Sequence, residues 1–201
     1  MYWQVYFHKT VVAADQMLSK ILFRARTLVR NNVDLFTTPA LKFFLKDHIT
    51  ISDLDNDVKG GHYKLLELFS KIDDYDIMCS IKNWTNHSDK ILSFLSERLV
   101  NRKLFRIIIQ NQPFDKSYIE EIKSRAKKLF GFNTEEVENI VFSDYMSNNA
   151  YSVKNDNINI LYKTGSIADI AVASDVSNVS SLAKTVKKYF ICYPKDCEKI
   201  Q

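Results

Sequence analysis

An aromatic ring, an imidazole and an ammonium group lie within four positions near the start of the chain, on Tyr6, His8 and Lys9. Such a set can hold a nucleotide, because the ring stacks on a base or sugar while the cations bind phosphate oxygens. A solvated helix end is the simpler interpretation of the same residues. The sequence alone leaves both interpretations open.

The usual catalytic patterns of hydrolases are missing from the sequence. The four histidines have no partner at metal-ligand spacing: H-x-x-x-H, H-E-x-x-H and a His-Asp dipeptide do not occur. The sequence also has no Gly-rich phosphate loop and no G-x-S-x-G nucleophile elbow. We therefore expect no catalytic residue and no metal ligand in this chain.

Two groups of aspartates could suggest a metal site. The aspartates in residues 53–57 alternate as in a calcium loop. The glycine and the bidentate Glu of such a loop are not at the required offsets, so we expect a polar loop without a metal ion. Those in residues 73–76 point in different directions on a helix and stabilise its N-terminus. Both groups are predicted to be structural.

The composition is typical of a globular protein with a buried core. Of 201 residues, 46% are hydrophobic and 26% charged, and the low counts of Gly (4) and Pro (3) favour helices. The formal net charge is +4, with Lys and Arg scattered along the chain. This distribution argues against nucleic acid as a partner.

Cysteine usage and hydropathy bear on the compartment. Three widely spaced cysteines, Cys79, Cys192 and Cys197, argue against a disulfide framework and favour a reducing environment. No stretch approaches the roughly 18 to 20 apolar residues of a membrane span, and no basic region followed by an apolar run marks a signal peptide. We expect a cytoplasmic location and no membrane contact.

Apolar periodicity predicts a helical N-terminal lobe. Residues 2–31 carry one apolar stripe and should form a single helix that starts without a capping residue, which indicates a truncated chain. A Thr cap before Pro39 predicts a short helix. Three more helices are expected at residues 62–69, after residues 73–74, and at residues 88–101 with Ser88 as the cap.

After Arg102 the pattern changes to strands and helices. Strands are expected at residues 104–109, 140–143, 158–163, 170–173 and 189–193. Helices are expected at residues 115–131, ended by Gly131, and near residues 179–183. The predicted fold class is α+β, with a mainly helical lobe over residues 1–102 and a smaller α+β lobe with a short antiparallel sheet over residues 103–201.

Four segments carry a family resemblance. They are residues 5–10 (Val-Tyr-Phe-His-Lys-Thr), residues 68–84 (beginning Leu-Phe-Ser-Lys-Ile-Asp-Asp-Tyr-Asp), residues 99–105 (Leu-Val-Asn-Arg-Lys-Leu-Phe) and residues 158–164 (Ile-Asn-Ile-Leu-Tyr-Lys-Thr). In this order they resemble segments of HD-domain phosphohydrolases, which include the deoxynucleoside triphosphate triphosphohydrolases. The match spans most of the chain, and each motif alone is moderately specific.

The resemblance implies roles for five residues. Tyr6 would line a substrate pocket against the sugar or base. His8 and Lys9 would contact nucleotide phosphates. Arg102 and Lys163 match positions that reach the phosphates of an effector in allosterically regulated members.

Simpler interpretations stand beside these roles. Arg102 could complement the dipole at a helix C-terminus, and Lys163 could protect a strand edge. Regulated members often carry basic residues just before the tyrosine, where this chain has Trp3, Gln4 and Val5. That departure argues against an allosteric role for these residues and against a deoxynucleotide as the substrate.

The family's metal ligands, a His, a His-Asp pair and a later Asp, lie upstream of the matching region. The resemblance therefore implies the C-terminal part of a metal-dependent HD-domain phosphohydrolase, which supplies pocket walls and a subunit interface and is inactive without its N-terminal HD half. The alternative is a nucleotide-sensing or oligomerisation module without catalysis. Expected partners are the missing half with its divalent metal, a nucleoside triphosphate as substrate or effector, and further copies in a homo-oligomer.

Overall fold

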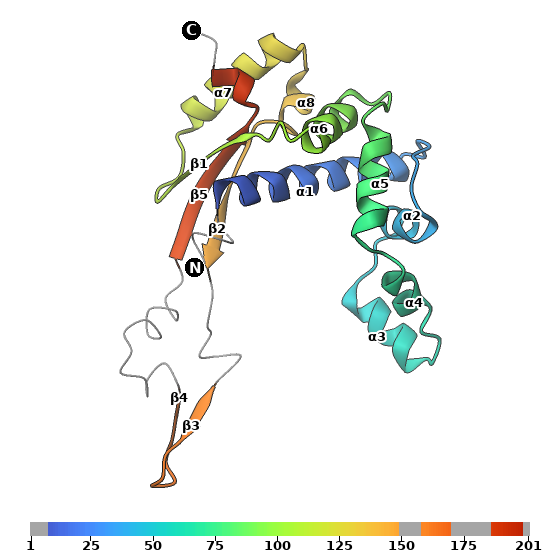
Figure 1. Cartoon of the computed structure of the whole chain (residues 1–201), viewed down its shortest axis with the longest axis vertical. Helices are drawn as coiled ribbons and strands as arrows, with labels where there is room; N and C mark the ends of the chain where they lie inside the picture. The colour runs from blue at the N-terminus through green and yellow to red at the C-terminus, as the bar shows by residue number, and fades with distance from the viewer. Residues whose placement is uncertain (1–7, 149–157, 170–185, 199–201) are drawn as a thin grey trace.

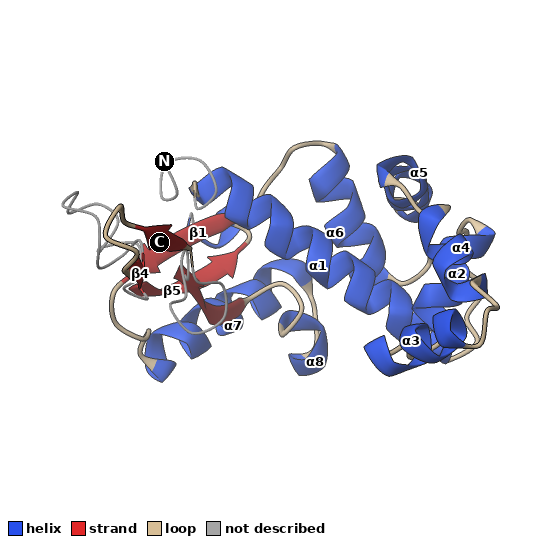
Figure 2. Cartoon of the chain, turned by 90° about the horizontal axis from the view of Figure 1, so that it is seen from below, coloured by secondary structure: helices blue, strands red, loops and turns tan. Residues whose placement is uncertain are grey.

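The computed structural model describes residues 8–148, 158–169 and 186–198. A helical region comes first and is followed by mixed helices and strands (Figure 1). The strands lie at one end of helix α1, while α2 to α5 surround its other end (Figure 2). The helices are α1 (Lys9–Arg30), α2 (Pro39–Lys46), α3 (Ile51–Lys59), α4 (Lys64–Ser70), α5 (Asp74–Trp84), α6 (Lys90–Val100), α7 (Lys116–Phe130), α8 (Thr134–Val137) and the 3-10 helix η1 (Lys195–Glu198).

Helix α1 is the element around which the others pack. Its apolar stripe leaves Met17, Ile21 and Ala25 with no exposed surface. The helix contacts α2, α6 and the first strand, β1. The backbone N–H of Phe105, directly before β1, donates a hydrogen bond to the Met17 sulfur at 3.4 Å. One helix thus joins the helical region to the sheet.

Three antiparallel strands form the main sheet, in the order β1-β5-β2. In the central strand, Ile191 pairs with Ile108 of β1 on one side and with Ser143 of β2 on the other. The hairpin β3–β4 forms a separate two-stranded sheet, drawn well away from the main sheet in Figure 1. The strands are β1 (Arg106–Gln110), β2 (Phe142–Asn148), β3 (Asn159–Leu161), β4 (Ile167–Asp169) and β5 (Val186–Tyr193).

The observed architecture confirms the predicted α+β fold with a short antiparallel sheet. The strand predicted at residues 170–173 and the helix near residues 179–183 lie outside the described residues. Helix α8, strand β4 and η1 were not predicted. One hydrophobic core takes residues from both sides of position 102, among them Met17, Leu95 and Ile191, and the division into lobes at that position stays a prediction.

A side-chain cap and a glycine cap explain two helix ends that the sequence predicts correctly. The Asp73 carboxylate accepts hydrogen bonds from the N–H groups of Tyr75 and Asp76, at 2.8 and 3.1 Å, and Asp76 in turn accepts from the Asp73 N–H at 2.9 Å. This capping box confirms that these acids stabilise a helix start. Gly131, with φ 68°, ends α7 in the left-handed conformation that glycine adopts easily.

Two predicted caps are wrong. Helix α1 begins at Lys9 with His8 as its N-cap, so this helix does have a capping residue, and the imidazole accepts a hydrogen bond from a backbone N–H. Helix α6 is capped by Asp89 instead of Ser88, because the Asp89 carboxylate accepts from the Leu92 N–H at 2.8 Å. Aspartate and serine are about equally good caps, so propensity alone does not choose between adjacent positions.

Residues 53–57 do not form the expected polar loop but lie within α3. Thr50 and Asp53 form a capping box there, in which the Asp53 carboxylate accepts from the Thr50 N–H at 2.8 Å. The alternating aspartates therefore belong to a helix start and a helix surface. The sequence signal for this helix, Thr-x-x-Asp, is a weak form of the usual capping box.

A partly buried ion pair fixes α1 against the start of α6. The Arg24 guanidinium donates two hydrogen bonds to the Asp89 carboxylate, at 3.0 and 2.6 Å. Burial raises the pKa of Asp89, but the hydrogen bonds from Arg24 and from the Leu92 N–H outweigh it, so the net pKa is lowered. The ionised pair therefore stabilises the folded state above the ordinary pKa of aspartate.

We predict that Asp89→Asn lowers the free energy of unfolding by about 1 to 3 kcal/mol at pH 7, since asparagine keeps the cap but loses the ion pair. The contribution of Asp89 is present above its unfolded pKa and is lost as the pH falls through its lowered folded pKa. Urea denaturation at pH 7 and pH 3 should show that the difference between wild type and variant narrows in acid. An equal difference at both pH values would contradict the assignment.

Candidate functional site: a basic cavity at the start of helix α1

A cavity of about 250 Å³ lies where the start of α1, the α6–β1 connection and η1 meet. We call it the basic cavity because four of its lining side chains are cationic: Lys9, Arg102, Arg106 and Lys195. Its other lining residues are Thr10, Leu104, Phe105 and Ile107. Segments that are far apart in the sequence thus bring four positive charges to one place.

Few carboxylates balance these charges. Arg106 pairs with Glu198, with 3.1 Å between Nε and Oε1. Within the described ranges, Lys9, Arg102 and Lys195 have no carboxylate within 4 Å. The cavity therefore keeps a net positive charge that attracts anions, and charge-assisted hydrogen bonds from Lys and Arg are the strong kind.

The start of α1 adds to this positive potential. Its first turn contains Lys9 and Thr10 and no acidic side chain. The N-terminus of a helix carries a partial positive charge and exposes backbone N–H groups, and anions bind there readily. In this protein the helix end and the four cations act on the same cavity.

The backbone places Arg102 in an unusual conformation. Helix α6 ends in a Schellman turn: the Arg102 N–H donates to the Leu99 carbonyl at 3.1 Å, and the Lys103 N–H donates to the Arg98 carbonyl at 2.8 Å. The residue at the turn, Arg102, has φ 56°, where glycine is strongly favoured. The chain thus keeps an arginine at a strained position that faces a basic cavity.

A salt bridge holds two cavity segments together. The Arg98 guanidinium lies over the Phe94 ring, 4.4 Å from its centroid, and binds the Asp196 carboxylate at 2.8 Å. Asp196 follows Lys195 directly. The backbone carbonyl of Arg98 accepts the Schellman hydrogen bond that shapes the turn at Arg102. This pair therefore connects the segments that carry two of the four cations.

The structure describes four of the five candidate residues. It brings Lys9 and Arg102 to the same cavity. His8 is the exposed N-cap of α1, with its Nδ1 accepting from the Thr10 N–H at 3.3 Å. Tyr6 lies outside the described residues. Lys163 is exposed in the β3–β4 turn and does not line the cavity.

Sequence reasoning missed Arg106 and Lys195. Arg106 lies four positions after Arg102, at the start of β1, and faces the same cavity. The pattern of Arg102, Leu104 and Arg106 at alternating positions is a local signal that could have indicated a shared face. Lys195 has no such signal, because η1 is placed by long-range packing.

The rest of the described chain offers little other chemistry. Within it, no group of three or more His, Cys, Asp and Glu side chains could hold a metal ion. The three cysteines are free, and burial raises the pKa of Cys192 to about 12 and that of Cys197 to about 11, which makes both thiols poor nucleophiles. None of the helices in the described ranges combines the length and hydrophobicity of a bilayer span.

Comparison with known proteins finds two similar proteins, one of which is named a phosphohydrolase. No family model matches the sequence. The uncharacterized protein YwfO of Bacillus subtilis (strain 168) is 28% identical over 203 residues, which cover 98% of this chain and 42% of that protein. A crystal structure of a phosphohydrolase from Bacteroides thetaiotaomicron VPI-5482 is 40% identical with a TM-score of 0.77, covering 96% of this chain and 47% of that one.

This chain is similar in sequence and fold to part of a phosphohydrolase. It spans less than half the length of both relatives. Activities of a whole protein of that length are therefore not carried over to this chain by similarity alone.

We predict that Arg102→Gly stabilises the fold by about 1 kcal/mol, because glycine relieves the left-handed strain at the Schellman turn. Arg102→Ala is the matched control, since it removes the same guanidinium but retains the strain. Guanidinium chloride denaturation measures both. Equal stability of the two variants would show that the backbone at Arg102 is not strained.

We also predict that Glu198→Gln strengthens binding of tripolyphosphate about two- to fivefold at low salt, because it releases Arg106 from an exposed ion pair. Glutamine keeps an oxygen that can accept from the Tyr193 hydroxyl, at 3.3 Å in the wild type. Isothermal titration calorimetry gives the affinities. Unchanged affinity would mean that Arg106 makes no contact with the anion.

Proposed function

We propose that this chain is the C-terminal part of a metal-dependent HD-domain phosphohydrolase that acts on nucleotides of the deoxynucleoside triphosphate type. In this proposal the basic cavity binds nucleotide phosphates. The observation that carries it is the meeting of Lys9 and Arg102, two residues chosen from separate motifs, at one cavity. The similarity to a phosphohydrolase supports the reaction class.

The physical chemistry of the cavity suits a triphosphate. Three cations without a carboxylate partner can each donate charge-assisted hydrogen bonds to phosphate oxygens. The planar guanidinium of Arg102 can bind two oxygens at once, whereas the ammonium groups of Lys9 and Lys195 act as point charges. The cavity would hold the polyphosphate, His8 next to Lys9 would also contact phosphate, and Tyr6 would contact the sugar or base.

The metal site belongs to another part of the proposed enzyme. A divalent metal would activate water and offset phosphate charge during hydrolysis. The described residues of this chain contain no ligand cluster for such an ion. In this proposal catalysis uses the metal ligands of the N-terminal HD half, and this chain contributes binding residues.

Lys163 has a place in this proposal only in an oligomer. It lies in the exposed turn between β3 and β4 and is not among the residues that line the basic cavity of the same chain. A contact between Lys163 and bound phosphates would come from a neighbouring copy. Such a contact would place an effector between subunits.

A second candidate function is nucleotide sensing without catalysis. It is favoured by a cavity that has cations but no metal ligands among the described residues. In that case the nucleotide would regulate assembly or the binding of a partner. It would then be released without being hydrolysed. Binding measurements alone do not separate the two functions, but turnover does.

We predict that titration with dGTP in the presence of manganese gives saturable binding, and that Lys9→Ala and Arg102→Ala each weaken it about tenfold through loss of a charge-assisted hydrogen bond. Lys116→Ala is the control, since this exposed lysine lies on α7 and does not line the cavity. Isothermal titration calorimetry measures all four proteins.

Three outcomes have different meanings. Binding that weakens about tenfold in Lys9→Ala and in Arg102→Ala, but not in Lys116→Ala, supports the phosphate site. A continuous heat of turnover by this chain alone would contradict the claim that catalysis needs the HD half. Binding that is unaffected by both cavity variants, or no binding at all, would remove the basic cavity as a nucleotide site.

A further inference from the structure

The helical hairpin of α3 and α4 exposes apolar side chains without burying any residue. Neither helix contributes a buried residue, and Ile51, Leu66 and Phe69 are 80%, 44% and 65% exposed. Helices of nine and seven residues are too short to be stable alone in water. Within the described part of the chain, the Phe69 ring meets the Phe44 ring of α2 edge-on, with 6.0 Å between their centroids, but neither helix of the hairpin is stabilised by a buried side chain.

One face of α3 combines apolar side chains with a negative charge. Ile51, Asp55 and Val58 follow the i, i+4, i+7 spacing that places side chains along one helix face, and all three are exposed. Asp53 and Asp57 accept hydrogen bonds within the hairpin. Asp55 forms no salt bridge or hydrogen bond of its side chain with another described residue, so its carboxylate is available to a partner.

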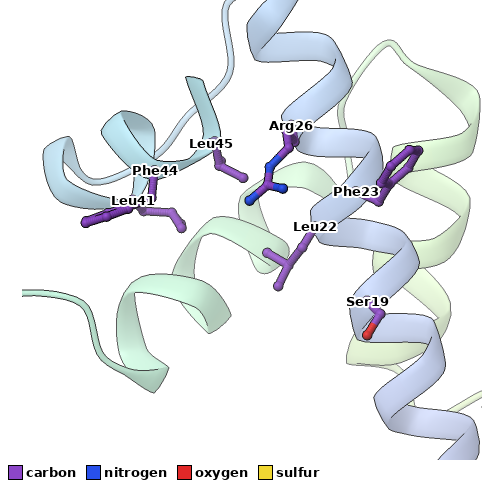
Figure 3. A pocket seen from close by; sticks show the side chains of 7 residues that line it. All are labelled: Ser19, Leu22, Phe23, Arg26, Leu41, Phe44 and Leu45. Atoms are coloured by element: carbon purple, nitrogen blue, oxygen red, sulfur yellow. The ribbon is translucent and has the colours of Figure 1, made fainter. Parts of the chain in front are cut away.

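The opposite combination occurs in a groove between α1 and α2 (Figure 3). This α1–α2 groove has a volume of about 330 Å³, and Arg26 extends from α1 toward α2 across it. No carboxylate of the described residues lies within 4 Å of the Arg26 guanidinium. The apolar side chains around it are Leu22, Phe23, Leu41, Phe44 and Leu45.

We propose that α3 of one copy docks into the α1–α2 groove of a second copy. Ile51 and Val58 pack against the apolar side chains of the groove, and Asp55 pairs with Arg26 of the second copy. Since every copy carries both surfaces, a two-fold axis forms the contact twice in a closed dimer. The hairpin projects beyond α2 and α5 in Figure 1, which gives it access to a neighbour.

Size and charge favour a second copy over other partners. The groove is apolar with one central cation, and α3 supplies the matching apolar face with one central anion. A salt bridge surrounded by apolar contacts fixes the register of the two helices and discriminates against partners without the acid. This inference does not depend on the proposed hydrolase function.

A charge exchange between the two surfaces tests the proposal. In analytical ultracentrifugation the wild type should form a dimer that dissociates on dilution. Arg26→Glu and Asp55→Arg should each weaken the dimer at least about tenfold, because each places like charges opposite one another. The double variant Arg26→Glu/Asp55→Arg should restore the affinity to within about threefold of wild type, since it re-forms the pair in reverse.

Two controls separate interface effects from folding. Lys116→Glu makes the same charge change as Arg26→Glu on an exposed residue of α7, at the other end of the molecule, and should leave the dimer unchanged. Circular dichroism and thermal denaturation identify any variant that fails to fold, and Phe23→Ser then tests the apolar side of the groove. A monomeric wild type at millimolar concentration, or a double variant as weak as the single ones, would overturn the proposal.

Discussion

The burial of one face of α1 is the constraint on which the rest of the structure depends. This helix of 22 residues is about 33 Å long and is buried along most of its length by elements from both halves of the chain. Its first turn forms part of the basic cavity, and its third to fifth turns line the α1–α2 groove. Lys9 and Arg26 are therefore held about 25 Å apart along one rigid axis.

The basic cavity shows how electrostatic cost and backbone strain are offset by packing. Four cations close together repel one another, and Arg102 adds the strain of a left-handed residue. The Arg98–Asp196 salt bridge and the stacking of Arg98 on Phe94 hold the two segments in place despite this cost. Such an arrangement is poorly explained by stability alone, because glycine at Arg102 and fewer cations would give a more stable turn. An anionic ligand would remove the repulsion.

The sequence predicted the helices better than the site. Long amphipathic stretches such as α1, α6 and α7 have enough periodic positions to be recognised, and local caps at Asp73 and Gly131 mark ends correctly. Short elements were missed or misassigned. Helix α3 is an example, because it has a weak capping signal and no buried stripe. The convergence of Lys9 and Arg102 could be anticipated only from a family resemblance. Lys195 could not be anticipated, since its position follows from the packing of η1 against α7 and from the Arg98–Asp196 pair.

The central strand of the main sheet comes last among the described strands, and this order affects synthesis on the ribosome. Both β1 and β2 pair with β5 and not with each other, so neither has a partner until residues 186–193 have left the exit tunnel. The helices around α1 rely on nearer contacts and can assemble earlier. Between the emergence of β2 and that of β5, two unpaired strands are therefore exposed, and unpaired edges promote aggregation. Chaperone binding to residues 106–148 of the nascent chain, until β5 emerges, is the expected consequence of this topology.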